Sequence, residues 1–151
     1  MQSLRSEIRR SRYLAYANSG IVPTDAHVLI IGDRPGPRAA VDPDFHGTPF
    51  YGDKFSGGYV NRLLDAANIA ETSLMWINAY SQAGVPSDGR ILFCKAWDQV
   101  IVLGNNANTW ISKRGEVGYT KVEHPQAHRR FNQTKYAYPL IQLLHKYAVP
   151  T

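Results

Sequence analysis

The stretch His27-Val-Leu-Ile-Ile-Gly-Asp-Arg34 decides the fold, because an apolar run rich in β-branched residues ends there at a glycine. Such a run is typical of a strand that is buried on both faces of a sheet. Two further runs of this kind cover residues 74–78 and 100–103, and a shorter one covers residues 120–123. We therefore expect a strand at each of these places.

Helices are predicted between these strands by apolar residues at helical spacing. They cover residues 3–17, 56–68, 107–112 and 136–147. Strands that alternate with helices favour a parallel sheet covered on both faces. The sequence therefore predicts a three-layer α/β/α fold with a central, mostly parallel, four-stranded sheet, and residues 1–151 are expected to form a single domain.

Composition excludes several classes of protein. An apolar fraction of 44% can fill a core, which excludes a disordered chain. Cys94 is the only cysteine, so an internal disulfide framework, a zinc site of several cysteines and a four-cysteine iron–sulfur cluster are excluded. No apolar run approaches the roughly 20 residues that cross a bilayer, and the N-terminus lacks the apolar stretch of a signal peptide. We expect a cytoplasmic, nucleoid-associated monomer with no membrane partner, metal or cofactor.

The positive charge is concentrated in two places. The chain has 17 Lys and Arg against 12 Asp and Glu, a net charge of +5 that could serve solubility alone. However, arginines crowd positions 5, 9, 10 and 12, and His128, Arg129 and Arg130 form a second cluster. Basic clusters of this kind suit phosphate backbones, so single- or double-stranded DNA is the expected partner.

Polar residues end each of the predicted strands. They are Asp33, Asn78, Asn105 and His124. Taken singly, each has an ordinary structural interpretation, as a turn cap, the end of a strand or a surface loop residue. Because ligands of parallel sheets bind beyond the carboxyl ends of the strands, the four together predict one functional site.

The two glycine-containing loops do not match the common phosphate-binding motifs. The loop at residues 32–36 lacks the Gly-Lys-Ser/Thr ending of a P-loop, and it also lacks the third glycine and the immediate helix of a dinucleotide site. The next loop, residues 47–58, is rich in glycine and would let the backbone approach a flat ligand. Phe50 or Tyr51 could stack on that ligand, although Phe50 could equally be a core aromatic.

The order of the motifs resembles that of the uracil-DNA glycosylase superfamily, particularly its shorter bacterial and archaeal branches. The segments are VLIIGDRPG (28–36), HGTPFYGDKFSGGYVNRLLDAANI (46–69), MWINAY (75–80), VIVLGNNANTWI (100–111) and EHPQAHRRF (123–131). Together they span residues 28–131, about two-thirds of the chain. The resemblance implies the superfamily's α/β fold.

The resemblance also implies roles for individual residues. Asp33 would place the hydrolytic water or stabilise the sugar cation, and Asp53 competes for that role. Phe50 would stack on the extruded base, and Asn78 would bind its Watson–Crick edge. His124 would donate a hydrogen bond to the carbonyl oxygen of the departing base.

Further residues are expected around this centre. Gly32 and Tyr51 complete the expected base-binding set. The expected DNA contacts are Arg34, Lys54, His128, Arg129 and Arg130.

The chemistry of an N-glycosidic bond fits an acid and a histidine. Its cleavage spreads positive charge over the sugar and negative charge over the base, so an anion and a hydrogen-bond donor are both useful. We therefore expect a monofunctional DNA glycosylase that removes uracil or a modified or damaged pyrimidine. The alternatives are a DNA- or modified-base-binding module that has lost hydrolysis, which Arg34 and the altered His-Pro-Gln loop motivate, and an enzyme of free nucleosides or base exchange.

Overall fold

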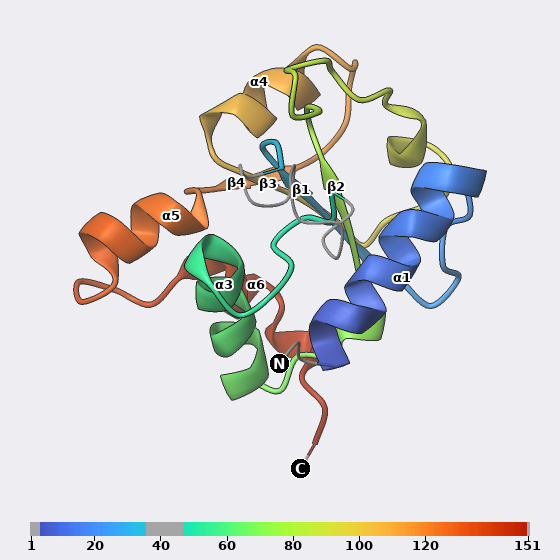
Figure 1. Ribbon diagram of the computed structural model, residues 1–151. Coiled ribbons are helices and arrows are strands. Elements are labelled where there is room, and N and C mark those ends of the chain that lie inside the picture. The colour runs from blue at the N-terminus through green and yellow to red at the C-terminus, as the bar shows by residue number, and fades with distance from the viewer. Residues whose placement is uncertain (1–3, 36–46, 151) are drawn as a thin grey trace.

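The fold is built on a four-stranded parallel sheet. The computed structural model describes residues 4–35 and 47–150. The strands are β1 (Val28–Gly32), β2 (Leu74–Asn78), β3 (Gln99–Leu103) and β4 (Thr120–Val122), in the spatial order β2-β1-β3-β4 (Figure 1). Every neighbouring pair is parallel. The prediction of a four-stranded sheet is confirmed, and the sheet is wholly rather than mostly parallel.

Both faces of the sheet are buried, as the continuous apolar runs predict. Along β1, Leu29 and Ile31 pack in one core cluster, whereas Val28 and Ile30 pack in the other. This alternation follows from the two-residue period of a strand. The strands therefore separate two apolar layers, which is the three-layer arrangement expected from the sequence.

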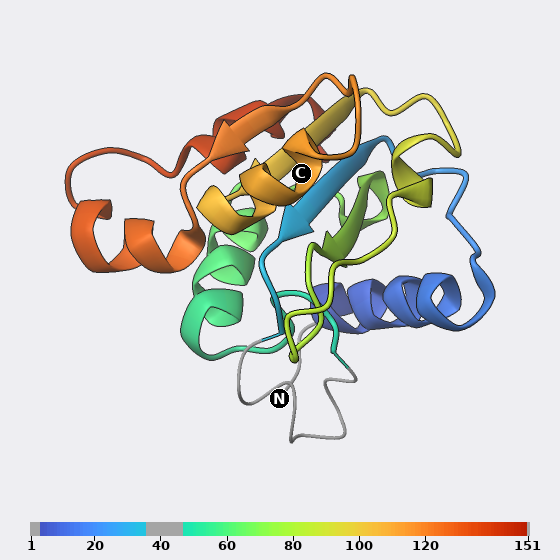
Figure 2. The same ribbon diagram turned by 90° about the horizontal axis from the view of Figure 1, so that it is seen from above.

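Helices cover the two layers and one edge. Helix α4 (Asn105–Ser112) contributes to the cluster that holds Leu29, whereas α3 (Phe55–Ala66) and α6 (Pro139–Leu143) contribute to the one that holds Val28. Figure 1 shows α4 on the opposite side of the sheet from α3 and α6. Helix α1 (Leu4–Ser19) contacts β2, and Figure 2 shows it beside that edge of the sheet.

The last predicted helix, residues 136–147, is wrong in its extent. Helix α6 begins only at Pro139, and a separate 3₁₀ turn follows at His145–Tyr147. Proline disfavours helical backbone at the preceding residue but suits the first helical position. Tyr138 is accordingly extended, so the apolar stripe that begins at Tyr136 overstates the helix.

Shorter elements complete the chain. Two further 3₁₀ turns lie at Glu71–Ser73 and Arg90–Leu92. After β4, the short helix α5 (Pro125–Ala127) continues into a π-helical turn at His128–Asn132. Among the described residues, no helix is both long enough and apolar enough to cross a membrane.

The strand order creates a switch point at β1. The chain passes from β1 to β2 on one side and later places β3 on the other side of β1. Ligands of open parallel sheets bind at the carboxyl ends beside such a point. Asp33 directly follows β1, so the fold places it at this position.

Candidate functional site

Asp33, Phe50, Asn78 and His124 meet at the carboxyl edge of the sheet. Gly32 and Asn78 are paired across β1 and β2, which places Asp33 beside the end of β2. A Cβ atom added at Gly104, after β3, would lie 3.2 Å from Cβ of His124, which follows β4. The prediction that the strand ends form one site therefore has structural support.

His124 offers one hydrogen-bond donor to this site. Its Nδ1 accepts a hydrogen bond of 3.1 Å from the backbone N–H of Gln126, so the neutral ring carries its proton on Nε2. Burial lowers the pKa of His124 below its ordinary value of 6.5, and the nearby Asp33 carboxylate opposes this in part. The imidazole is therefore neutral at pH 7, and Nε2 has no hydrogen-bond partner among the described residues.

One carboxylate oxygen of Asp33 accepts no hydrogen bond from the described residues. Its Oδ2 accepts a hydrogen bond of 3.0 Å from Nδ2 of Asn106 in the first turn of α4. Its Oδ1 is buried without a hydrogen-bond partner in the described part of the chain. Oδ1 does form an ion pair with Arg34, whose Nε lies 3.8 Å away. Oδ1 can therefore accept a proton or face a developing positive charge.

The ring of Phe50 lies between Trp76 and His124. The ring centroids of Phe50 and His124 are 5.7 Å apart, and those of Phe50 and Trp76 are also 5.7 Å apart. A Cβ atom at Gly32 would approach Cε2 of Phe50 to 2.8 Å. Gly32 therefore serves the site by leaving space for the aromatic ring.

The side chain of Asn78 is held by hydrogen bonds. Its side chain is buried, and Nδ2 donates a hydrogen bond of 3.0 Å to the carbonyl oxygen of Gly47. The phenol of Tyr13, on α1, also forms a hydrogen bond with the Asn78 side chain. Burial raises the pKa of Tyr13, which this hydrogen bond partly offsets, so the phenol stays protonated. The amide is thus fixed in orientation next to Asp33.

Three expected site residues take no part in the contacts among Asp33, Phe50, Asn78 and His124. Tyr51 is buried with its hydroxyl donating to Glu7 at 2.7 Å, so its ring belongs to the contact with α1. Asp53 and Lys54 are exposed in the turn before α3. The carboxylate that acts on His124 is that of Asp33, which favours Asp33 over Asp53 as the acid.

The second basic cluster is only partly available to a ligand. His128 is 1% exposed, with Nδ1 hydrogen bonded to the Tyr59 hydroxyl and Nε2 to the carbonyl oxygen of Tyr136. Because both ring nitrogens are occupied, His128 does not fit the expected role of a DNA contact. Arg129 donates to the side-chain oxygen of Gln126, whereas Arg130 is exposed.

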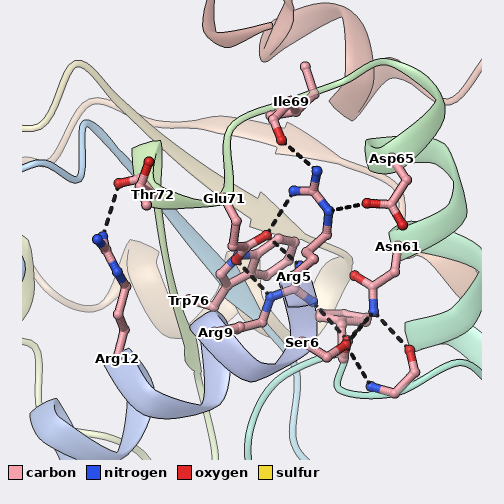
Figure 3. Close-up of polar contacts among 12 residues, drawn as sticks. Arg5, Ser6, Arg9, Arg12, Asn61, Asp65, Ile69, Glu71, Thr72 and Trp76 are labelled. Atoms are coloured by element: carbon pink, nitrogen blue, oxygen red, sulfur yellow. Dashed lines mark hydrogen bonds and ion pairs between the residues drawn. The ribbon is translucent and has the colours of Figure 1, made fainter. Parts of the chain in front are cut away.

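Much of the N-terminal cluster of arginines is engaged within the protein. Figure 3 shows the side chains of Arg5 and Arg9 directed toward Glu71. Arg5 is 9% exposed and Arg9 is 1% exposed. Arg12 binds the carbonyl oxygen of Thr72 and the carboxylate of Asp25. Arg5 and Arg9 are therefore buried structural groups, and the expected role of phosphate contact is wrong for these two residues.

Sequence reasoning did not assign two residues of the site. Asn106 binds Asp33, whereas its neighbour Asn105 accepts a hydrogen bond from Lys121. The Gly-Asn-Asn sequence predicts an amide side chain at the end of β3. Which of the two asparagines faces β1 depends on the rotation of α4 about its axis. Tyr13 was predicted only as part of a helical stripe.

The described residues show no grouping of three or more His, Cys, Asp or Glu side chains that could hold a metal ion. Neither the known protein-family models nor the curated proteins contain a match to this chain.

Proposed function

We propose that this protein is a DNA N-glycosylase that removes uracil or a modified pyrimidine. The observation that supports this most is the pairing of a neutral imidazole with a carboxylate beside an aromatic ring. His124 presents an N–H donor, Asp33 presents an oxygen that accepts no hydrogen bond from the described residues, and the Phe50 ring lies next to His124. These are the groups that cleavage of a glycosidic bond to a flat base requires.

The reaction can be written with these groups alone. The bond between C1′ and the base nitrogen breaks, and its electron pair leaves with the base. The N–H of His124 stabilises the negative charge that grows on the base carbonyl oxygen, and Asp33 stabilises the positive charge on the sugar. Water then bonds to C1′ and gives a proton to Oδ1 of Asp33, which leaves an abasic site.

Reaching the bond requires the nucleotide to leave the base stack. Extruding a base from a duplex costs a few kcal/mol, which stacking and hydrogen bonds in the site must offset. The Phe50 ring supplies a stacking surface, and the fixed Asn78 amide can bind the edge of a base. Both residues directly neighbour Gly32.

Exposed cations near this edge support DNA as the substrate. Lys54, Arg62, Arg130 and Lys135 are exposed, and none has an ion pair among the described residues. They lie on or beside α3 and in the segment that follows α5, and α3 contacts α5. Phosphates bound by these side chains would orient a nucleic acid without reading its sequence.

A binding module without hydrolysis is the second candidate. Two observations favour it: Arg34 partly balances the charge of Asp33, and the NH₂ group of Asn78 is already engaged by Gly47. Such a module would bind modified bases in DNA and release none.

The test measures base release and DNA binding together. The DNA substrates carry uracil, hydroxymethyluracil, hypoxanthine or a thymine mismatch, each single- and double-stranded. We expect wild-type protein to release one of these bases and Asp33→Asn or His124→Ala to lose about 10²–10⁴-fold in rate. The exposed residues Asp88 and His145 supply matched controls, since Asp88→Asn and His145→Ala should keep the activity. Salt-sensitive binding without release from any substrate would favour the module.

A further inference from the structure

The backbone around Phe50 has an unusual conformation that must be held from outside. Phe50 has a φ of 50°, a region that bulky side chains rarely adopt. Such a strained residue persists only when its surroundings fix it. The position of the Phe50 ring beside His124 therefore depends on whatever holds this backbone.

Side chains of two helices hold it. The carbonyl oxygen of Phe50 accepts hydrogen bonds from Nη1 of Arg9 at 2.8 Å and from Nδ2 of Asn61 at 3.0 Å. The same Asn61 NH₂ group donates to the carbonyl oxygen of Gly52 at 2.9 Å, and Ser6 Oγ accepts from the Gly52 N–H at 3.1 Å. Figure 3 shows Ser6 and Arg9 coming from α1 and Asn61 from α3.

Arg9 is itself fixed by a buried carboxylate and an indole. Its Nε and Nη2 each lie 3.0 Å from an oxygen of Glu71, and its guanidinium lies 4.0 Å from the ring centroid of Trp76. Trp76 donates its indole N–H to the same carboxylate at 2.9 Å. Since Trp76 also contacts the Phe50 ring, Arg9 and Trp76 fix both the backbone and the ring of Phe50.

From this geometry we infer that Arg9 and Asn61 are positioning residues of the candidate site, which hold the Phe50 ring against His124 and so set the stacking surface for the base. Only the expected effect of these residues on base release rests on the proposed function. The contact that the inference concerns, Phe50 against His124, is one between two side chains of the protein.

The alternative is that Arg9 has a purely structural role. A variant of Arg5 distinguishes this alternative from a positioning role. Arg5 lies on the same helix, is also buried and also binds Glu71, but its other partners are Asp65 and the carbonyl oxygen of Ile69. Lysine at either position keeps the charge but lacks the planar fork that reaches several acceptors. Arg5→Lys therefore perturbs the same ion-pair network without touching Phe50.

The experiment records the NMR signals of the His124 ring protons, assigned by their loss in His124→Gln. Phe50→Leu defines the full change that follows removal of the aromatic ring. We expect Arg9→Lys and Asn61→Leu to shift the His124 signals toward those of Phe50→Leu, and Arg5→Lys to leave them in place. In base release, we expect a loss between about 10- and 100-fold for Arg9→Lys and no loss for Arg5→Lys.

Equal shifts in Arg9→Lys and Arg5→Lys, or no shift in Arg9→Lys and Asn61→Leu, would overturn the inference. If Arg9→Lys does not fold, Asn61→Leu decides alone, because its NH₂ group makes the other contacts to residues 50 and 52. If wild-type protein releases no base, the glycosylase proposal fails while the His124 spectrum still tests the positioning role.

Discussion

At the scale of single residues, His124 has a protonation state that the fold dictates. Its Nδ1 accepts a backbone N–H, and burial lowers its pKa, so protonation breaks a hydrogen bond and buries a charge. The unfolded chain, with an ordinary His pKa near 6.5, binds a proton more readily than the folded protein. Stability from this group is therefore complete above about pH 6.5 and is lost as the pH falls below it.

This difference can be measured by urea unfolding between about pH 5 and pH 8. We expect the free energy of unfolding of wild-type protein to fall more steeply toward pH 5 than that of His124→Gln, which cannot titrate. Parallel curves for the two proteins would show that His124 has the same pKa in the folded and unfolded states.

Gly32 is the residue at which added volume should disturb the site most directly. A methyl group there would approach Phe50 Cε2 to 2.8 Å and Oδ1 of Asn78 to 3.3 Å. We expect Gly32→Ala to lower the free energy of unfolding by about 1–3 kcal/mol and to shift the His124 ring signals. Gly118→Ala is the control, because no atom lies within 4 Å of a Cβ at that position. An unchanged His124 spectrum in Gly32→Ala would contradict the close contact between β1 and Phe50.

At the scale of elements, Glu71 joins α1 to β2 and to the loop at residues 50–52. Its carboxylate accepts from Arg5, Arg9 and Trp76, and all four side chains are buried. Removing one partner of a buried ion pair leaves the other uncompensated, at a cost of about 3–5 kcal/mol. We expect Glu71→Gln to lose stability of this order in urea unfolding, whereas Asp88→Asn, in the exposed pair with Arg90, should change little. An equal loss of unfolding free energy in Glu71→Gln and Asp88→Asn would mean that the buried ion pairs of Glu71 stabilise the fold no more than the exposed pair does.

The elements also show which structural features the sequence patterns predict. Strand β2 matches its predicted residues, because a continuous apolar run reports burial on both faces. The extent of α6 could not be taken from its apolar stripe, since Pro139 sets its start. The ends of parallel strands predicted Asp33, Asn78 and His124 as neighbours, but the choice of Asn106 over Asn105 depends on the rotation of α4, which periodicity does not fix.

Charge patterns were the least reliable guide. The arginines of α1 have the spacing of a basic surface, yet Glu71, more than 60 residues away in sequence, turns two of them into buried structural groups. His128 lies among arginines in sequence, but its ring packs with Tyr59, Tyr136 and Tyr138. Whether a cation faces solvent depends on partners that are distant along the chain, and no local pattern contains that information.

At the scale of the whole molecule, exposed cations without an ion pair among the described residues lie on and beside α3 and in the segment after α5. If this surface binds phosphates, affinity for DNA should fall steeply as salt rises. We expect Arg130→Ala and Lys54→Ala to weaken binding on every sequence and to reduce the salt dependence. Lys146→Ala is the control, because Lys146 is paired with Asp98. An identical loss in the control would mean that DNA binding follows net charge and not this surface.

The account as a whole depends on Asp33 and His124 acting together on one bond. Single-turnover base release from DNA tests this most directly, with wild-type protein, Asp33→Asn, His124→Ala and the double variant compared on the substrate that wild-type protein prefers. We predict release by wild-type protein, a loss of about 10²–10⁴-fold in each single variant, and a double variant that loses much less than the product of the two, as groups that act as a unit do. Release by Asp33→Asn and His124→Ala at the wild-type rate, or none by wild-type protein on any substrate, would contradict it.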